Sequence, residues 1–492
     1  MHSSTTDRPF PSGPYLVAGL GRAGRAAIEA LAATSGVEQV SAWDRCSDGA
    51  VRALARGLRR RGVEVRLGGD GLAALDAAGK GATIVKSPGI DMRRVLFQLA
   101  RERDQQVLDE LELGWSLSRD PIVGVTGTNG KSTTAKLIAT VLGAAGHTAQ
   151  LCGNTEFGPP LSAATPGGWR VCEVSSFQLE ATRAFLPDVG VFTNLTLEHL
   201  ARHTDMENYG AIKRSMFFRG DLPVEAAVVN IDDPFGHRLA LDLDRAGARV
   251  VSYGFHADAD VRVQDATWDM HMARQHLRTP DGAVECATRL PGRYNASNVA
   301  AAFAMGQLIG LSAPSVSQAL EGAGGPPGRW ERIAGPQEFD VVVDFAHNPD
   351  GIRQLLETAR AVIAGRDGAA LRAVFGPTGA FEAGKEREIG RLAGTLSDHL
   401  ILTTGTLNYD ARVVRLEELR AAASGGGAAV EIELDRRAAI ERAIAAARPG
   451  DVVALLGLGA LERLVMDTVG TSIPFDDRQV ASEALNKIRS IT

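Results

Sequence analysis

The chain has 492 residues, 45% of them hydrophobic, with a formal net charge of −6 and a pI near 6.0. This length predicts about two to four domains with ample apolar core. The mildly acidic balance argues against a nucleic-acid-binding surface. No apolar run approaches the roughly 18 residues of a membrane span.

The four cysteines, Cys46, Cys152, Cys172 and Cys286, show no C-x-x-C spacing. Neither a zinc site nor a disulfide framework is therefore expected, and a reducing cytoplasm fits this usage. The polar N-terminus lacks the apolar stretch of a signal peptide, so residues 1–13 are predicted to be a flexible tail.

The first predicted α/β block spans residues 14–118. A strand at residues 15–18 runs into Gly19-Leu-Gly21-Arg-Ala-Gly24, then a helix from Arg25 to about Ala33, then a strand at residues 39–43 that ends at Asp44. These glycines and the acidic residue form a dinucleotide fingerprint. The turn fits NAD, the diphosphate of another nucleotide, or close packing of a helix on a strand, and the residues leave all three open. Residues 63–65 and 83–85 form the ends of two further predicted strands, and the second of these precedes Lys86-Ser87-Pro88-Gly89.

The second predicted block, residues 119–324, opens with a phosphate loop. A Val/Ile-rich strand leads into Gly127-Thr128-Asn129-Gly130-Lys131-Ser132-Thr133 and an amphipathic helix through about Ala145. Backbone amides and the helix N-terminus attract phosphate oxygens, Lys131 reaches the outer phosphates, and Ser132 or Thr133 is suited to Mg²⁺. The loop is a variant, because Val125 stands where the strict pattern has glycine. A Gly-rich turn that merely caps a helix is the alternative, but the strand–turn–helix context favours ATP binding.

Two later strands of this block end at polar residues. Residues 169–173 end at Glu173, and residues 188–193 lead into Asn194 and His199. Parallel strands gather their C-termini at one sheet edge, so these side chains are expected near the phosphates, with Glu173 placed for Mg²⁺. By itself, His199 also fits an ordinary surface or packed histidine. The segment 252–290 alternates polar and apolar residues and predicts a peripheral antiparallel insert.

The glycines and prolines of residues 322–328 predict a linker or hinge before a third block, residues 325–492. Its strands are expected at residues 339–345, 372–375, 399–403 and 452–456. The first ends in Asp344-Phe-Ala-His347-Asn348-Pro-Asp350, a second candidate site. The predicted fold class is α/β with three domains: a Rossmann-like N-terminal domain, a central P-loop ATPase domain with a parallel sheet, and a Rossmann-like C-terminal domain.

These residues resemble the Mur ligases, ATP-dependent amide-forming enzymes of peptidoglycan precursor synthesis, over nearly the whole chain. The phosphate loop is the most specific mark. Gly153-Asn154, Glu173-Val-Ser-Ser-Phe-Gln-Leu-Glu180, Asn194-Leu-Thr-Leu-Glu-His199 and Lys86-Ser-Pro-Gly89 are similar to the subgroup that adds D-glutamate to UDP-N-acetylmuramoyl-L-alanine. The resemblance implies a cytoplasmic monomer that uses ATP and Mg²⁺, with this UDP compound and an amino acid as substrates.

The resemblance also implies roles for single residues. The UDP substrate would contact Gly19, Gly21, Gly24, Asp44, Arg45 and Ser87 of the first block and Asn154 of the second. ATP would contact Asn295, Asn298, Arg329, Asp344 and His347 as well as Gly127, Thr128, Asn129, Gly130, Lys131, Ser132 and Thr133. Mg²⁺ would be held by Ser132, Glu173, His199 and a carbamylated Lys213. Catalysis would fall to Lys131, His199 and Lys213, although Lys213 also fits a plain helix-surface lysine.

The third block, expected to bind the amino acid, departs from the D-glutamate subgroup. Residues 344–350 are closer to ligases that add diaminopimelate or lysine and to folylpolyglutamate synthases, and Asp476-Asp477-Arg478 is similar to the former. Yet Thr404-Gly-Thr-Leu-Asn-Tyr-Asp-Ala-Arg412 replaces the Asp-Asn-Pro-Arg signature for diaminopimelate, and the Ser-Pro-Ala-Cys-Ala-Ser signature for D-glutamate is missing too. D-glutamate is the main expectation, and another Mur-type amino acid or a folate-type ligation is the alternative. A nicotinamide oxidoreductase and a non-catalytic nucleotide-binding subunit are the competing classes.

Overall fold

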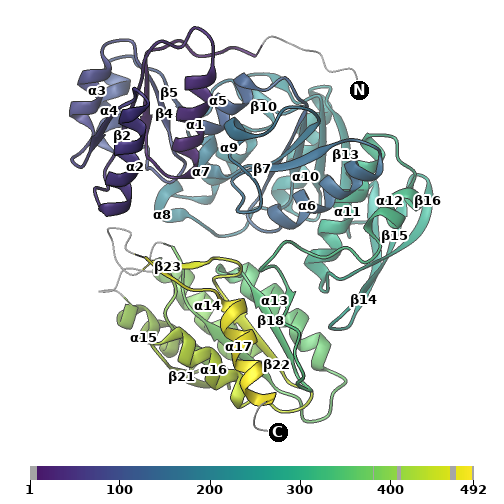
Figure 1. Cartoon of the computed structure of the whole chain (residues 1–492). Coiled ribbons are helices and arrows are strands. Elements are labelled where there is room, and N and C mark those ends of the chain that lie inside the picture. Colours follow the sequence, from purple (N-terminus) through teal and green to yellow (C-terminus); the bar gives the residue numbers. More distant parts are fainter. Residues whose placement is uncertain (1–7, 380–381, 407–411, 466–471, 490–492) are drawn as a thin grey trace.

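The computed structural model describes residues 8–379, 382–406, 412–465 and 472–489. Within them the chain forms three large sheets joined in sequence order (Figure 1). The first two sheets and their helices form one lobe, and the third forms a second lobe beneath it in this view. The α/β, three-domain architecture that the sequence predicted is confirmed.

The first sheet is five-stranded and parallel, in the order β3-β2-β1-β4-β5. Its central strand β1 is fully buried because helices cover both faces of the sheet. The elements are β1 Tyr15–Ala18, α1 Arg22–Ala33, β2 Val40–Asp44, α2 Gly49–Arg60, β3 Glu64–Leu67, α3 Leu72–Ala78, β4 Thr83–Lys86, α4 Val95–Glu102, β5 Val107–Asp109 and α5 Glu110–Leu117.

The second sheet has nine strands in the order β16-β15-β14-β13-β12-β9-β6-β8-β7. In this order, β14, β13, β12, β9, β6, β8 and β7 are parallel to one another. Strands β15 and β16 add an antiparallel hairpin at the edge next to β14. The predicted insert therefore extends the main sheet. The elements are β6 Ile122–Thr126, α6 Lys131–Ala144, β7 Ala149–Gly153, η1 Leu161–Ala163, β8 Trp169–Glu173, α7 Ser176–Leu179, β9 Val189–Phe192, α8 Leu200–His203, α9 Met206–Arg214, β10 Phe218–Arg219, β11 Leu222–Pro223, β12 Ala226–Asn230, α10 Pro234–Arg245, β13 Arg249–Gly254, β14 Val261–Trp268, β15 Ala273–Thr279, β16 Gly282–Thr288, α11 Arg293–Leu308 and α12 Ala313–Leu320.

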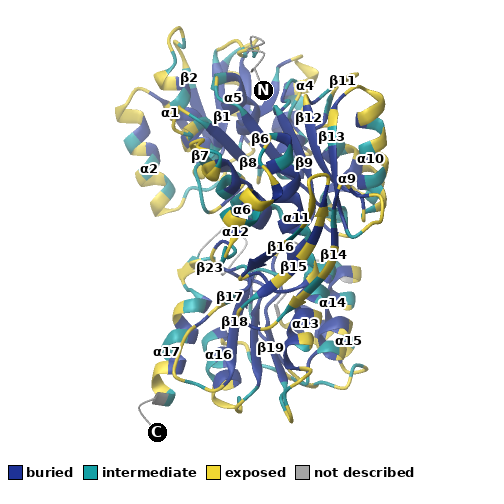
Figure 2. Cartoon of the chain, turned by 90° about the vertical axis from the view of Figure 1, so that its right-hand side faces the viewer, coloured by how far each residue is buried: buried dark blue, intermediate teal, exposed yellow. Residues whose placement is uncertain are grey.

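The third sheet is six-stranded, in the order β17-β18-β22-β19-β20-β21, and all its pairs are parallel except β17 with β18. Figure 2 shows its strands buried between helices whose outer faces are exposed. The elements are β17 Glu331–Arg332, β18 Asp340–Asp344, α13 Pro349–Ile363, β19 Leu371–Phe375, α14 Ala383–Leu396, β20 His399–Leu402, α15 Arg412–Ala423, β21 Ala429–Ile432, α16 Arg436–Ala445, β22 Val452–Leu456, β23 Arg463–Val465, β24 Ser472–Pro474 and α17 Asp477–Arg489.

Two expectations about the first block need correction. Helix α1 begins at Arg22 rather than Arg25, because Gly21 already has the extended backbone of an N-cap. Residues 8–13 are held in place and are not a flexible tail: Arg8 donates to the Ser118 carbonyl at 3.1 Å and pairs with Asp188 at 3.0 Å. Residues 1–7 lie outside the described residues. None of the helices in the described ranges is long and apolar enough to cross a membrane.

Candidate active site

The phosphate loop closes the C-terminal end of β6 and begins α6. Gly127 and Gly130 have φ of +146° and +85°, conformations that favour glycine. A Cβ on Gly130 would lie 2.5 Å from Asn298 Oδ1, so this turn also has no room for a side chain. Lys131 Nζ folds back and donates to the carbonyls of Gly127 at 3.2 Å and Thr128 at 2.8 Å. The ammonium group is therefore held above the loop, where anionic phosphate oxygens would be drawn.

A hydroxyl and a carboxylate meet beside this loop. The parallel register pairs Val125 with Glu173, which brings the end of β8 next to the end of β6. Ser132 Oγ donates to Glu173 Oε2 at 2.6 Å. One carboxylate and one hydroxyl, completed by phosphate oxygens and water, form a donor set that suits Mg²⁺. The residues thus fit a magnesium ion bound together with a nucleotide.

Lys213 and His199 line one cavity together with the loop. Lys213 is buried on α9, its Nζ donates to the Gly127 carbonyl at 2.7 Å, and burial lowers its pKa well below the usual value. Because Lys213 is buried, it is not the ordinary helix-surface lysine that the sequence also allowed. An ammonium is not a metal ligand, so Lys213 fits a metal only as a neutral amine or a carbamate.

His199 caps α8 in a left-handed conformation with φ +60°. Its ring lies 4.7 Å from that of Phe177, and burial lowers its pKa to about 3 although Glu198 opposes this shift. The imidazole is therefore neutral at physiological pH, the form that binds metals.

The third sheet contributes the end of β18 and the loop after it. Asp344 accepts hydrogen bonds from the amides of Trp330 and Ala346, both at 2.7 Å, and burial raises its pKa. The Arg329 guanidinium lies 4.3 Å from the centre of the Phe345 ring. His347 Nδ1 donates to the Phe345 carbonyl at 2.8 Å, which leaves Nε2 as the unprotonated nitrogen of the neutral ring.

One cavity of about 430 Å³ joins these groups. It is lined by Thr128, Asn129, Gly130, Lys131, Ser132, Thr133, Asn154, Glu173, His199, Lys213, Asn295, Asn298, Arg329, Asp344 and His347. Asn298 links α11 to α6, because its Oδ1 accepts a hydrogen bond from Thr134 Oγ1 at 3.1 Å, and within α11 its Nδ2 donates to Asn295 Oδ1, also at 3.1 Å. The structure therefore brings the predicted ATP, metal and catalytic residues of two blocks to one place.

Sequence reasoning missed the contact that joins the phosphate loop to the third sheet. Asn129 Nδ2 donates to Asp350 Oδ2 at 2.9 Å, and Asn348 Nδ2 donates to Asn129 Oδ1 at 2.9 Å. Asn348 is the N-cap of α13 and is followed by Pro349, a helix-start signal visible in the sequence. Phe177, Glu198 and Tyr209 also line the cavity without having been predicted as site residues.

The first glycine-rich turn lies outside this cavity. Gly19 has φ +97°, and a Cβ on Gly24 would lie 1.7 Å from the Gly19 carbonyl oxygen, so Gly24 is required by close packing of α1 on β1. Asp44 accepts a hydrogen bond from the Leu20 amide at 2.7 Å, and Arg45 is exposed. Ser87 lies against Gly19, and the next residues, Pro88 and Gly89, line the cavity. The loop after β4 thus runs from the first turn to the cavity, and Asn154 lines the cavity itself.

Comparison with known proteins adds a family to this geometry. Residues 125–306 match the Mur ligase middle domain, and residues 328–459 match the Mur ligase glutamate ligase domain. A UDP-N-acetylmuramoyl-L-alanyl-D-glutamate–2,6-diaminopimelate ligase of Gloeobacter violaceus is 36% identical over 394 residues, which cover 75% of this chain and 78% of that protein. A UDP-N-acetylmuramyl-tripeptide synthetase of Roseiflexus sp. (strain RS-1) is 34% identical over 75% of this chain and 79% of its own length.

A solved structure has a similar fold over nearly the whole length of this chain. The UDP-N-acetylmuramate-alanine ligase of Thermotoga maritima aligns with a TM-score of 0.59 over 98% of this chain and all of that one, at 19% identity. At this identity the likeness shows the fold alone. Together with the matched domains and the relatives above 30% identity, these findings place the chain in the Mur ligase family, the ATP-dependent amino acid ligases of peptidoglycan synthesis.

Proposed function

We propose that this ligase adds an amino acid to the peptide of a UDP-N-acetylmuramoyl substrate, and that UDP-N-acetylmuramoyl-L-alanyl-D-glutamate with 2,6-diaminopimelate is its substrate pair. The names of relatives 36% identical over three quarters of the chain support this pair. They favour the alternative of a different amino acid over the D-glutamate addition that the sequence motifs suggested. The amino-terminal resemblance, Lys86-Ser-Pro-Gly89 with a single five-stranded sheet, keeps D-glutamate as the second candidate.

The observation that carries the proposal is the convergence of two sets of groups in one cavity. Lys131, Ser132 and Glu173 are suited to the phosphates and metal of ATP, and Asn295, Asn298, Arg329 and Asp344 are suited to its nucleoside. The loop amides and the N-terminus of α6 would hold the phosphate chain. Ser132 and Glu173 would hold Mg²⁺, which when bound neutralises charge on the transferred phosphoryl group.

Amide formation in water requires an activated carboxylate. The substrate carboxylate would attack the terminal phosphorus of ATP, and the bond to the ADP oxygen would break to leave an acyl phosphate. The amine of the incoming amino acid would then attack the acyl carbon, lose a proton and expel inorganic phosphate. Lys131 would stabilise negative charge on the phosphoryl oxygens, and the arrangement of the loop would hold the reacting groups close together.

Lys213 is proposed to act after modification. Burial favours its neutral amine, the form that reacts with carbon dioxide to give a carbamate. A carbamate next to the phosphate loop, together with the neutral imidazole of His199, would supply ligands for a second Mg²⁺. Mass spectrometry of the intact protein in bicarbonate, with Lys213→Arg as the control, tests for the added carboxyl group.

The first glycine-rich turn is proposed to bind the diphosphate of the UDP substrate. Gly21 is exposed with nothing within 4 Å of its Cβ position, whereas Gly19 and Gly24 are buried; Asp44 and Ser87 contact the turn, and Arg45 is exposed next to Asp44. The loop through Pro88 and Gly89 would lead the rest of the substrate towards Asn154 and the cavity. A monomeric state, a cytoplasmic location and the domain boundaries at residues 14, 119 and 325 stay predictions.

A substrate panel tests the proposal. ATP-dependent phosphate release is measured with UDP-N-acetylmuramoyl-L-alanine or its D-glutamyl derivative, each combined with D-glutamate, 2,6-diaminopimelate or L-lysine, and with a folate as an unrelated acceptor. Release with the dipeptide substrate and diaminopimelate is expected. Release only with the alanine substrate and D-glutamate would restore the second candidate, and activity with folate alone would remove both. No release by the purified chain with any pair would favour a non-catalytic subunit.

A further inference from the structure

The short segment of residues 198–203, called the junction segment here, contacts both neighbouring sheets and carries His199 between those contacts. Its last turn holds Arg202, which reaches the loop after β4 of the first sheet. Its first residue, Glu198, pairs with Lys385 on α14 of the third sheet. Neither Arg202 nor Lys385 has a role in the proposed function.

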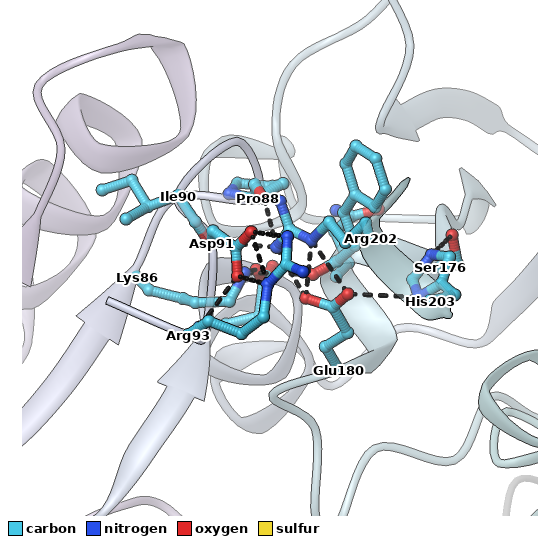
Figure 3. A network of polar contacts seen from close by, with 12 residues as sticks. Lys86, Pro88, Ile90, Asp91, Arg93, Ser176, Glu180, Arg202 and His203 are labelled. Carbon is cyan, nitrogen blue, oxygen red and sulfur yellow. Dashed lines mark hydrogen bonds and ion pairs between the residues drawn. The ribbon is translucent and has the colours of Figure 1, made fainter. Parts of the chain in front are cut away.

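Arg202 joins the junction segment to the first sheet (Figure 3). Its Nε donates to Glu180 Oε1 at 2.9 Å and its Nη2 donates to Glu180 Oε2 at 2.6 Å. The same Nη2 also donates to the Ile90 carbonyl at 3.0 Å. The guanidinium also lies 4.2 Å from the centre of the Phe177 ring, whose other neighbour is the His199 ring at 4.7 Å. A rigid, planar cation thus connects the loop beside the first glycine-rich turn to the ring that packs on His199.

The first sheet reinforces this contact from its own side. Lys86 is completely buried, and its Nζ bonds Asp109 Oδ2 and the Phe177 carbonyl, both at 3.0 Å. From the last residue of the junction segment, His203 Nε2 lies 2.9 Å from Ser176 Oγ. The segment 176–180 is therefore fixed between the loop after β4 and α8, as Figure 3 shows.

Lys385 joins the junction segment to the third sheet. Its Nζ lies 2.6 Å from Glu198 Oε1, and the two side chains are only 5% and 3% exposed. His347 Nε2, also from the third sheet, lies 3.8 Å from Glu198 Oε2. A buried carboxylate is costly unless a cation stays beside it, so Glu198 is stabilised in this position only while Lys385 remains next to it.

We propose that Arg202 and Lys385 are positioning residues that act on His199 from opposite sides, so that His199 is placed for the reaction only when both outer sheets are docked. This inference depends on the proposed role of His199. Because His199 adopts a left-handed backbone between the two contacts, its ring direction depends on where residues 198 and 202 are held. Loss of either contact would leave the segment free to relax.

The first test needs no turnover. Hydrogen exchange of the amides of residues 198–203 is measured in Arg202→Met and Lys385→Met, which keep the apolar stems. Two matched controls each remove an exposed arginine that forms an ion pair. Arg93→Met changes an arginine in the loop after β4 that is 62% exposed, and Arg391→Met changes an arginine on α14 that is 56% exposed. Exchange of the segment should rise about tenfold or more in the first two variants and stay near the wild-type rate in the controls. Unchanged exchange in both methionine variants would overturn the proposal.

The second test measures steady-state rates with the substrate pair that the panel identifies. Both methionine variants should lower kcat by about 10- to 100-fold, because a small misplacement of a catalytic group has that effect, while the KM for ATP changes less than about threefold. Lys385→Arg should retain most of kcat. In Glu198→Lys combined with Lys385→Glu, kcat should recover about tenfold over Lys385→Glu alone.

The two tests separate this inference from the proposed function. A wild-type chain without phosphate release in the whole panel would remove the proposed function, while hydrogen exchange would still decide whether the two cations hold the segment. A wild-type enzyme that is active, with charge reversal giving no recovery, would show that Lys385 acts on a substrate rather than on Glu198 and would overturn its positioning role.

Discussion

The two glycine-rich turns of this protein look alike in sequence and differ in what surrounds them. Both follow a buried parallel strand, β1 or β6, and both lead directly into a helix. In the first turn the Leu20 amide is bonded to Asp44, and Arg22 at the start of α1 donates to the Thr155 carbonyl at 3.1 Å. In the second turn, Lys131 and the Ser132–Glu173 pair face the cavity.

Glycines determine only the backbone of such a turn. They permit positive φ and close approach in both places, but the charged side chains next to them decide the chemistry. The second turn has an ammonium group and a metal-compatible carboxylate. The first has a carboxylate bonded to its own backbone and an arginine, Arg22, whose guanidinium donates to the carbonyls of Thr155 and Gly158, so it suits a bound diphosphate or packing rather than phosphoryl transfer.

Removal of Mg²⁺ should separate the two turns most strongly. With excess EDTA, phosphate release should fall below detection, because the transferring phosphoryl group loses its main counter-charge. Binding of the UDP substrate, measured by calorimetry, should change less than about twofold, since the first turn uses backbone amides. Equal loss of both would show that the first turn also depends on a metal, and added Mg²⁺ is the control.

Lys131→Ala should lower turnover by about a thousandfold or more, because one positioned cation on the phosphates is removed. The midpoint of thermal unfolding should stay within a few degrees, since the bonds of Lys131 among the described residues go to two carbonyls of its own loop. Lys80→Ala, which removes an exposed lysine of the first block, is the matched control. Wild-type ligation by Lys131→Ala would contradict the assignment of the phosphate loop.

Gly24→Ala should affect stability rather than chemistry. The added Cβ would meet the Gly19 carbonyl oxygen at 1.7 Å, and backbone cannot move aside easily, so a loss of about 2–3 kcal/mol in the free energy of unfolding is expected. Gly21→Ala is the control, because a Cβ there meets nothing within 4 Å. Urea denaturation measures both, and equal losses would show that packing does not explain Gly24.

Asp44→Asn should have the smallest effect. The carboxylate accepts hydrogen bonds from the amides of Leu20 at 2.7 Å and Cys46 at 2.8 Å, and asparagine offers only one acceptor oxygen. A loss of about 1 kcal/mol in the free energy of unfolding is expected, with a modest fall in affinity for the UDP substrate. A variant with wild-type stability and affinity would show that Asp44 neither holds the turn nor faces the ligand.

Local patterns predicted much of the fold and of the site. The strands at residues 15–18 and 452–456 were found because buried parallel strands are short runs of apolar residues. Strand β7 was missed: Ala149–Gly153 is only half-buried at the sheet edge and mixes polar with apolar residues. The subgroup was assigned less well: the motifs near the phosphate loop suggested D-glutamate, whereas relatives 36% identical to this chain are named as ligases for 2,6-diaminopimelate.

The sequence by itself determined the phosphate loop, the alternation of strands and helices and the membership of a ligase family, because each depends on residues that are neighbours in the chain. Only the tertiary structure decided that Asn129 meets Asn348 and Asp350, and that Lys385 meets Glu198 from 187 residues away. Such contacts form when separate sheets dock, and no local period records which distant side chains will then face each other.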